Sequence, residues 1–170
     1  SDIGAVLIFD EVTTGFRMTA GGIHLLLGVN PDIAVFAKAM SNGYAMAAIV
    51  GTEQVMQAAQ STFISSTNWT ERIGPAAALA TIQKYRRENV AAHLIGIGNL
   101  VTEGWKQAAQ EAGLKIHADG LPSLNHFSLD YAEELELTTL FTQLMLDKGY
   151  LAYSQFKPSF AHQGYHIEEY

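Results

Sequence analysis

The chain of 170 residues contains no cysteine, few basic residues and no long apolar run. The absence of cysteine excludes disulfides, thiol nucleophiles and cysteine-ligated metal sites. Ten Lys and Arg against 17 Asp and Glu give a net charge of -7, which argues against nucleic acid or an anionic membrane as the main partner. No apolar run is long enough to span a bilayer and no signal peptide precedes the first predicted strand, so we expect a cytoplasmic protein.

The composition is that of a folded chain, with 48% hydrophobic and 16% charged residues, enough for one domain or for part of a larger one. The chain enters its first apolar run within a few residues of its start, and residues 165–170 resemble the beginning of a helix. Both ends look cut, so we expect a piece of a longer protein.

The first apolar run, residues 5–9, leads directly into Asp10 and Glu11. A short apolar run bounded by turn residues predicts a buried strand of a parallel sheet. Ligands of open α/β sheets bind just outside the carboxyl ends of the strands. We therefore expect Asp10 and Glu11 to lie where chemistry takes place.

One interpretation of this stretch is a Walker B strand of a nucleotide hydrolase. In that arrangement Asp10 holds magnesium and Glu11 positions the attacking water. The chain contains no glycine-rich loop ending in Lys-Ser or Lys-Thr to bind phosphates, which weakens this interpretation.

A second interpretation begins with Lys38, which ends the next apolar run, residues 33–37. Burial lowers the pKa of a lysine and frees its amine for Schiff-base formation. A nearby carboxylate such as Asp10 can bind the protonated ring nitrogen of pyridoxal phosphate through a charge-assisted hydrogen bond, and the protonated ring then stabilises a carbanion. The hydroxyl-rich segment 65–68 suits a phosphate group.

The remaining pattern predicts a strand over 45–50 and a helix over 53–60 capped by Thr52. It then predicts helices over 70–87, capped by Thr70, and from Asn89 to a stop at Gly113. Alternating apolar residues predict strands near 114–118 and 125–129. Asp130 and Glu133 resemble a capping box for a helix that ends at Gly149. Residues 151–160 are expected to be loop or strand.

The ordered set of motifs resembles the class III pyridoxal-phosphate aminotransferases, a group that includes glutamate-1-semialdehyde aminomutase. The resemblance rests on residues 8–17, the Gly21-Gly22 pair, residues 28–32, Lys38 at its distance from Asp10, and the alanine-rich run 76–81. It implies an α/β chain of fold type I, with a mostly parallel sheet in a large domain and a small C-terminal α+β domain. We accordingly predict that residues 1–88 are the end of the cofactor-binding large domain and that residues 89–170 are the small domain, itself truncated.

The same resemblance implies roles for individual residues. Asp10 is similar to the partner of the pyridine nitrogen, Val12 to the residue packed on one ring face, and Lys38 to the Schiff-base lysine that also moves protons. Thr67 aligns with the threonine that reaches the phosphate of the neighbouring subunit's cofactor, with Thr62 as a second candidate. The resemblance thus implies a homodimer with its active site at the interface, and as substrates a small amino donor and a keto or aldehyde acceptor.

The chain departs from the family pattern in segments 41–46 and 68–72, which border the substrate in the family. The family's phosphate loop and ring-stacking aromatic, expected before Asp10, are not part of this chain. Three hypotheses are carried forward: amino-group transfer by transaminase or aminomutase, nucleotide hydrolysis through Asp10 and Glu11, and a non-catalytic truncated fragment.

Overall fold

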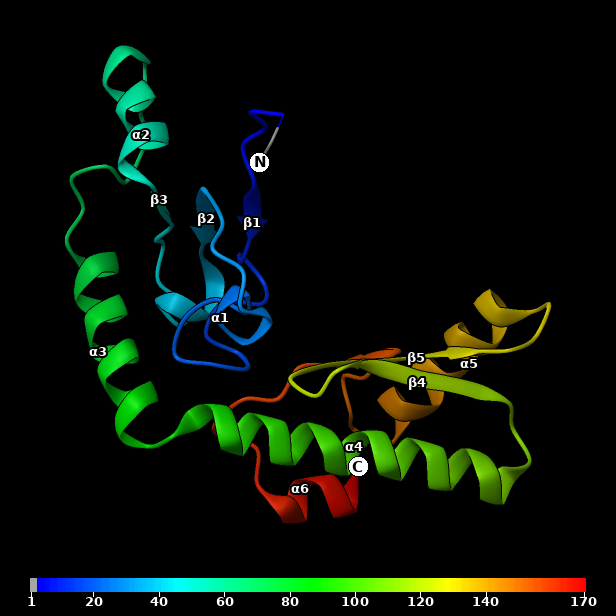
Figure 1. Cartoon of the computed structure of the whole chain (residues 1–170). Coiled ribbons are helices and arrows are strands. Elements are labelled where there is room, and N and C mark those ends of the chain that lie inside the picture. Colours follow the sequence, from blue (N-terminus) through cyan, green and yellow to red (C-terminus); the bar gives the residue numbers. More distant parts are fainter. Residues whose placement is uncertain (1–2) are drawn as a thin grey trace. The chain divides into compact units, whose positions relative to one another are not determined.

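The computed structural model describes residues 3–170, which divide between Ala91 and Ala92 into two compact units, unit 1 up to Ala91 and unit 2 from Ala92 to Tyr170. Figure 1 shows both units along the chain. Each is described by itself below. The predicted domain change after residue 88 stays a prediction about the whole protein.

Unit 1 contains a three-stranded sheet in the order β1-β2-β3, made of β1 (Ile8–Asp10), β2 (Ile33–Phe36) and β3 (Ala48–Gly51). The predicted mostly parallel sheet is mixed here, because β1 and β2 run parallel whereas β3 runs antiparallel to β2. The other elements are α1 (His24–Leu27), η1 (Lys38–Met40), α2 (Glu53–Met56), η2 (Gln57–Ser61) and α3 (Ile73–Arg87).

The prediction of a fully buried strand over 5–9 is wrong for this chain. Strand β1 begins at Ile8, and Ile8 is 57% exposed. The physical reason is that β1 is an edge strand, which among the described residues pairs only with β2. Full burial of a parallel strand requires neighbours on both sides and cover on both faces.

The core of unit 1 is an aromatic cluster between the sheet and α3. Phe16 lies 5.8 Å from the ring of Phe36 and 6.1 Å from the ring of Tyr85, and all three side chains are buried. The Phe16–Tyr85 pair meets edge to face, and such pairs stabilise beyond the area that they bury. The Tyr85 hydroxyl donates to the Arg17 carbonyl oxygen at 3.0 Å, which fixes α3 to the segment that follows β1.

The predicted helices lie in the right parts of the chain, but the residues that cap their first turns differ from those predicted. Helix α3 begins at Ile73, and the carboxylate of Glu71, not Thr70, accepts its first backbone N–H groups at 2.7 and 3.3 Å. The predicted helix after Thr52 ends at Met56 and continues as η2, and the Thr52 side chain makes no cap hydrogen bond. The short helix α1 had no counterpart in the prediction. Several types of polar side chain can accept the free N–H groups at a helix start, so where two such residues are neighbours the tertiary surroundings decide which one does.

Unit 2 is an antiparallel sheet packed on helices. Helix α4 (Val90–Ala112) leads into it, followed by β4 (Ile116–Leu121), β5 (Leu124–Leu129), α5 (Glu134–Asp147), β6 (Gln155–Phe156) and α6 (Gly164–Glu169). The sheet order is β4-β5-β6. The predicted helix after Asn89 and its stop at Gly113, which has a φ of 66°, are confirmed. The predicted capping box at Asp130 is wrong, because Glu133 is the N-cap of α5 and makes no side-chain cap bond.

The packing of α4 on the β4–β5 hairpin depends on two residues. Asn125, 2% exposed, donates to the Gly98 carbonyl oxygen at 2.7 Å. A side chain at Gly98 would overlap the Pro122 carbonyl oxygen, so helix and hairpin meet at van der Waals distance.

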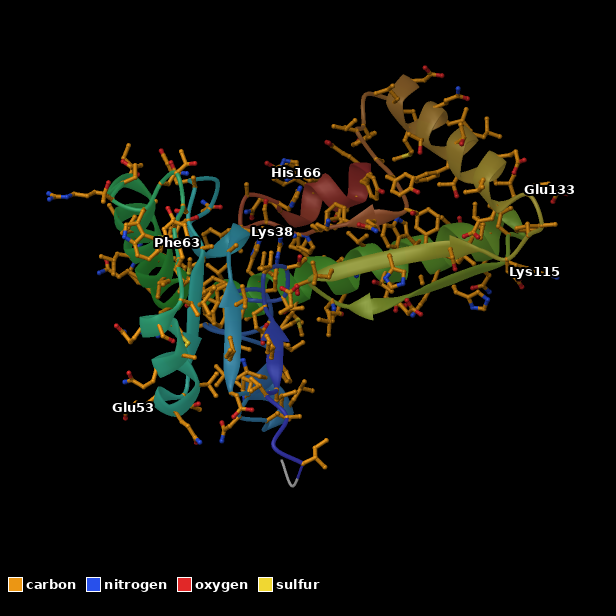
Figure 2. The ribbon with its side chains drawn as sticks, turned by 90° about the horizontal axis from the view of Figure 1, so that it is seen from above. Lys38, Glu53, Phe63, Lys115, Glu133 and His166 are labelled. Carbon is orange, nitrogen blue, oxygen red and sulfur yellow. The ribbon has the colours of Figure 1, made fainter. Side chains whose placement is uncertain are left out.

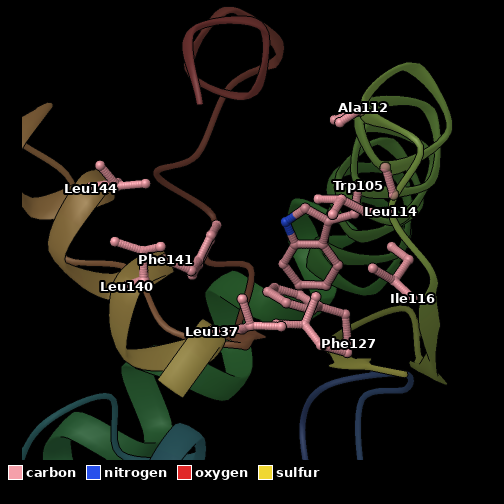
Figure 3. Close-up of a pocket in the computed structure, with 12 residues that line it drawn as sticks. Trp105, Ala112, Leu114, Ile116, Phe127, Leu137, Leu140, Phe141 and Leu144 are labelled. Atoms are coloured by element: carbon pink, nitrogen blue, oxygen red, sulfur yellow. The ribbon is translucent and has the colours of Figure 1, made fainter. Parts of the chain in front are cut away.

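An apolar cavity of about 440 Å³ lies among α4, the hairpin and α5 (Figure 3). Trp105, Phe127 and Phe141 form edge-to-face contacts at its wall, with centroids 4.9 and 5.3 Å apart. Among the described residues, no helix is both long and apolar enough to cross a membrane.

Candidate active site

Asp10 and Lys38 follow the carboxyl ends of two neighbouring parallel strands. Asp10 is the last residue of β1 and is paired in register with Val35 of β2, three residues before Lys38. Parallel strands end at the same edge of a sheet, so the topology brings both residues to one edge, as the sequence predicted. The sheet thus carries a carboxylate and an amine at the ends of two neighbouring strands.

Asp10 takes part in the turn that follows β1. Its Oδ1 atom accepts a hydrogen bond from the Val12 backbone N–H at 3.0 Å, the local geometry that aspartate favours in turns. The Asp10 side chain is exposed and Val12 is half-buried. The turn therefore leaves the carboxylate accessible to a ligand.

Lys38 begins η1 with a φ of 48°, a left-handed conformation that is uncommon for residues other than glycine. Its Nζ atom donates to Thr13 Oγ1 at 2.6 Å. The expectation of a buried lysine is wrong for this chain, because Lys38 is exposed two residues beyond the end of the central strand β2 (Figure 2). Unusual backbone angles cluster at functional sites.

Thr13 stands in a motif position that can approach the cofactor, but it is not among the site residues predicted from the sequence. Its hydroxyl oxygen accepts the hydrogen bond from the Lys38 amine. Position 13 lies directly after Val12 in the same turn, so proximity to the Asp10 motif was the available signal. Nothing in the spacing of 25 residues between Thr13 and Lys38 indicates a contact, because that depends on the path of the intervening loop.

Glu11 directly follows the exposed Asp10 and is completely buried. Its Oε1 atom accepts from the backbone N–H of His24 at 3.1 Å and from Nδ1 of His24 at 2.9 Å, and its Oε2 accepts from the Thr14 hydroxyl at 2.5 Å. Burial alone would raise the pKa of Glu11, but the hydrogen bonds from Thr14, Ile23 and His24 together hold that pKa below its ordinary value. An ionised carboxylate with these fixed partners is not free to position water, which argues against the Walker B interpretation.

Thr67 and Thr62 lie on the exposed segment between η2 and α3. Within residues 3–170, no hydrogen bond joins either threonine to Asp10 or Lys38. The same segment exposes Phe63 at 95% and Trp69 at 67%, and Figure 2 marks Phe63 on it. The structure therefore joins Asp10 to Val12 and Lys38 to Thr13 by hydrogen bonds at the ends of β1 and β2, and within the described residues it joins neither Thr62 nor Thr67 to them.

The residues at the sheet edge suit pyridoxal phosphate. The exposed carboxylate of Asp10 can accept a hydrogen bond from a protonated ring nitrogen. The accessible amine of Lys38 can form a bond to an aldehyde carbon. Val12, which lies between these two residues in the sequence, offers an apolar side chain. The site thus supplies two of the groups that this cofactor requires, a lysine for the Schiff base and a carboxylate partner for the ring nitrogen.

Comparisons with known proteins agree with this chemistry. A family model described as "Aminotransferase class-III" matches residues 1–154. The chain is 37% identical over 153 residues to the 2'-deamino-2'-hydroxyneamine transaminase of Streptomyces kanamyceticus, covering 86% of this chain and 38% of that protein. It is 32% identical to a glutamate-1-semialdehyde 2,1-aminomutase of Neisseria meningitidis, covering 86% of this chain and 37% of that protein.

Among solved structures, the chain matches the FumI protein of Sphingopyxis sp. MTA144, determined with its PLP, at a TM-score of 0.93 and 25% identity. That match covers 99% of this chain and 41% of the other. It confirms the predicted fold, that of pyridoxal-phosphate transaminases of fold type I. The chain spans less than two fifths of the length of the two curated relatives named above.

Proposed function

Because this chain belongs to the class III aminotransferase family, we propose that the whole protein is a pyridoxal-phosphate enzyme that transfers amino groups. The observation that carries the proposal is the placement of Asp10 and Lys38 after adjacent parallel strands, with the Lys38 amine accessible and held by Thr13. The substrates in this proposal are a small amino donor and a keto or aldehyde acceptor.

When bound, pyridoxal phosphate supplies an electron sink that stabilises negative charge on the carbon bearing the amino group. Asp10 would hold the ring nitrogen in its protonated form, because a carboxylate acceptor favours the charged donor. Val12 would pack against one ring face. Lys38 would attach the cofactor through Nζ and, when that amine is free, would carry protons at the same atom.

Both reaction types of the family belong to the proposal, because the relatives include a transaminase and an aminomutase. Product analysis with a single substrate separates the two. A transaminase needs a second molecule as amino acceptor and converts the donor to a carbonyl compound, whereas an aminomutase forms an isomer of its substrate with no added acceptor.

The proposal includes a homodimer in which Thr67 of one subunit approaches the phosphate of its neighbour's cofactor. Support comes from the segment between η2 and α3, which carries Thr67 together with the exposed side chains of Phe63 and Trp69. Exposed apolar side chains grouped on one segment are typical of an interface. A cytoplasmic location stays a prediction of the sequence.

The test is reduction of the whole protein with borohydride in the presence of pyridoxal phosphate, followed by peptide mass spectrometry. We expect the reduced cofactor on Lys38, and no adduct in Lys38→Ala. Lys115→Ala, at an exposed lysine of unit 2, is the matched control and should keep the adduct. A colourless wild-type protein that binds ATP and magnesium would favour the nucleotide hydrolase, and one that binds neither ligand would favour a non-catalytic fragment.

A further inference from the structure

Glu11 and His24 form a buried pair directly behind the turn that presents Asp10. The carboxylate is fully buried, and the side chain of His24 is 15% exposed. One carboxylate oxygen accepts from two groups of His24, its backbone N–H and Nδ1, and the other accepts from Thr14. Each of these oxygens is therefore tied to a different end of the loop between β1 and α1.

The backbone of Glu11 is fixed to the sheet as well. Its N–H donates to the Val35 carbonyl oxygen of β2 at 2.9 Å, and its own carbonyl oxygen accepts from Gly15 at 2.8 Å. The residues that would face the cofactor, Asp10, Val12 and Thr13, lie within this anchored segment. A change in the carboxylate contacts would consequently move the turn that carries all three.

The pair has little room to shift. The His24 ring lies in edge-to-face contact with Phe9 of β1, at 5.8 Å, and with Phe36 of β2, at 6.5 Å. A side chain at Gly22 would come within 2.5 Å of Glu11 Oε1. The imidazole of His24 thus contacts both strands. Gly22, which has no side chain, leaves room for the hydrogen bond between Glu11 and His24.

We propose that Glu11 and His24 are positioning residues, which set the turn of residues 10–15 and through it the carboxylate of Asp10 and the hydroxyl of Thr13 beside Lys38. This inference rests on the proposed function for its cofactor part only. The anchoring of the turn is a property of the fold and can be measured without cofactor.

The experiment compares the whole protein with its Glu11→Ala, His24→Ala and His24→Gln variants. The first readout is hydrogen exchange of residues 10–16 in the cofactor-free protein, and the second is the dissociation constant of pyridoxal phosphate from an absorbance titration. Asn125→Ala is the matched control, because it also leaves buried partners unsatisfied, at Gly98 and Thr102, but in unit 2.

Leaving buried donors without an acceptor has a large cost, so we expect Glu11→Ala and His24→Ala to speed exchange of residues 10–16 and to weaken cofactor binding, each by about tenfold or more. His24→Gln keeps a side-chain donor for the carboxylate and should recover most of both effects. Asn125→Ala should lower the melting temperature without either effect.

Unchanged exchange in folded Glu11→Ala would overturn the inference whether or not the cofactor binds. If Glu11→Ala does not fold, the difference between His24→Ala and His24→Gln decides, and equal values for the two would overturn it. Faster exchange in a protein whose wild type binds no pyridoxal phosphate would refute the proposed function and leave the anchoring of the turn supported.

Discussion

The Nζ atom of Lys38 donates a hydrogen bond of 2.6 Å to Oγ1 of Thr13, across 25 residues of sequence. Lys38 follows β2 and Thr13 lies in the turn after β1, so this bond joins the ends of two parallel strands. It holds the amine near Asp10 and Val12, the residues proposed to bind the cofactor ring.

Thr13→Val removes the acceptor for the Lys38 amine while keeping the shape of the side chain. We expect pyridoxal phosphate to be captured more slowly by about two- to tenfold, because one partly exposed hydrogen bond stabilises by roughly 0.5–1.5 kcal/mol. Stopped-flow absorbance measures the rate. Thr13→Ser should restore it, and a wild-type rate in Thr13→Val would show that the contact does not orient the lysine.

Glu71 and Thr70 are neighbours at the start of α3, and only Glu71 accepts hydrogen bonds from the first turn. Glu71→Ala should lower the free energy of unfolding by about 0.5–1 kcal/mol, as expected for loss of an exposed helix cap. Thr70→Ala should change it by less than about 0.5 kcal/mol. Urea titration of both variants compares them, and the reverse order would restore Thr70 as the cap.

Gly98 and Gly104 lie on the same helix but in opposite surroundings. A methyl group at Gly98 would overlap the backbone of Pro122, whereas nothing lies within 4 Å of the corresponding position at Gly104. Gly98→Ala should destabilise by roughly 1–3 kcal/mol or more because the hairpin must move away. Gly104→Ala should stabilise by about 0.5–1 kcal/mol through helix propensity. Thermal unfolding measures the change in melting temperature of each variant. Equal changes for the two variants would contradict the close packing of α4 on the hairpin.

The stability of unit 1 should fall at alkaline pH because of Tyr85. Burial raises the pKa of its hydroxyl to about 12, against a smaller opposite influence of Arg17. Because the folded state holds this proton more tightly than the unfolded state, the stabilisation is complete below the ordinary pKa of 10 and is lost as the pH rises toward about 12.

The urea midpoints of wild type and Tyr85→Phe, measured from pH 8 upward, test this dependence. The advantage of wild type over the variant should shrink above pH 10, the ordinary pKa of the group. Tyr44→Phe, at an exposed position, serves as control and should follow wild type. A constant difference between wild type and Tyr85→Phe across the range would refute the prediction.

Much of the fold was predictable because it follows from local periodicity. The apolar run before Lys38 became β2, and the helical spacing after Asn89 became α4, ended by Gly113. The details of caps were not predictable in the same way. Glu71 caps α3 instead of Thr70, since neighbouring polar side chains compete for the same N–H groups and small differences in loop path decide between them.

The sequence by itself determined that Asp10 and Lys38 lie at the ends of two neighbouring strands, because two apolar runs that lead into charged residues place those residues at the same end of a parallel sheet. Only the tertiary structure decided which partners they have. Thr13 accepts a hydrogen bond from Lys38, and Glu11 accepts one from His24. Both contacts depend on the path of a loop that has no periodic sequence pattern. The exposure of β1 was also decided there, because the burial of a strand depends on neighbours that its own residues do not specify.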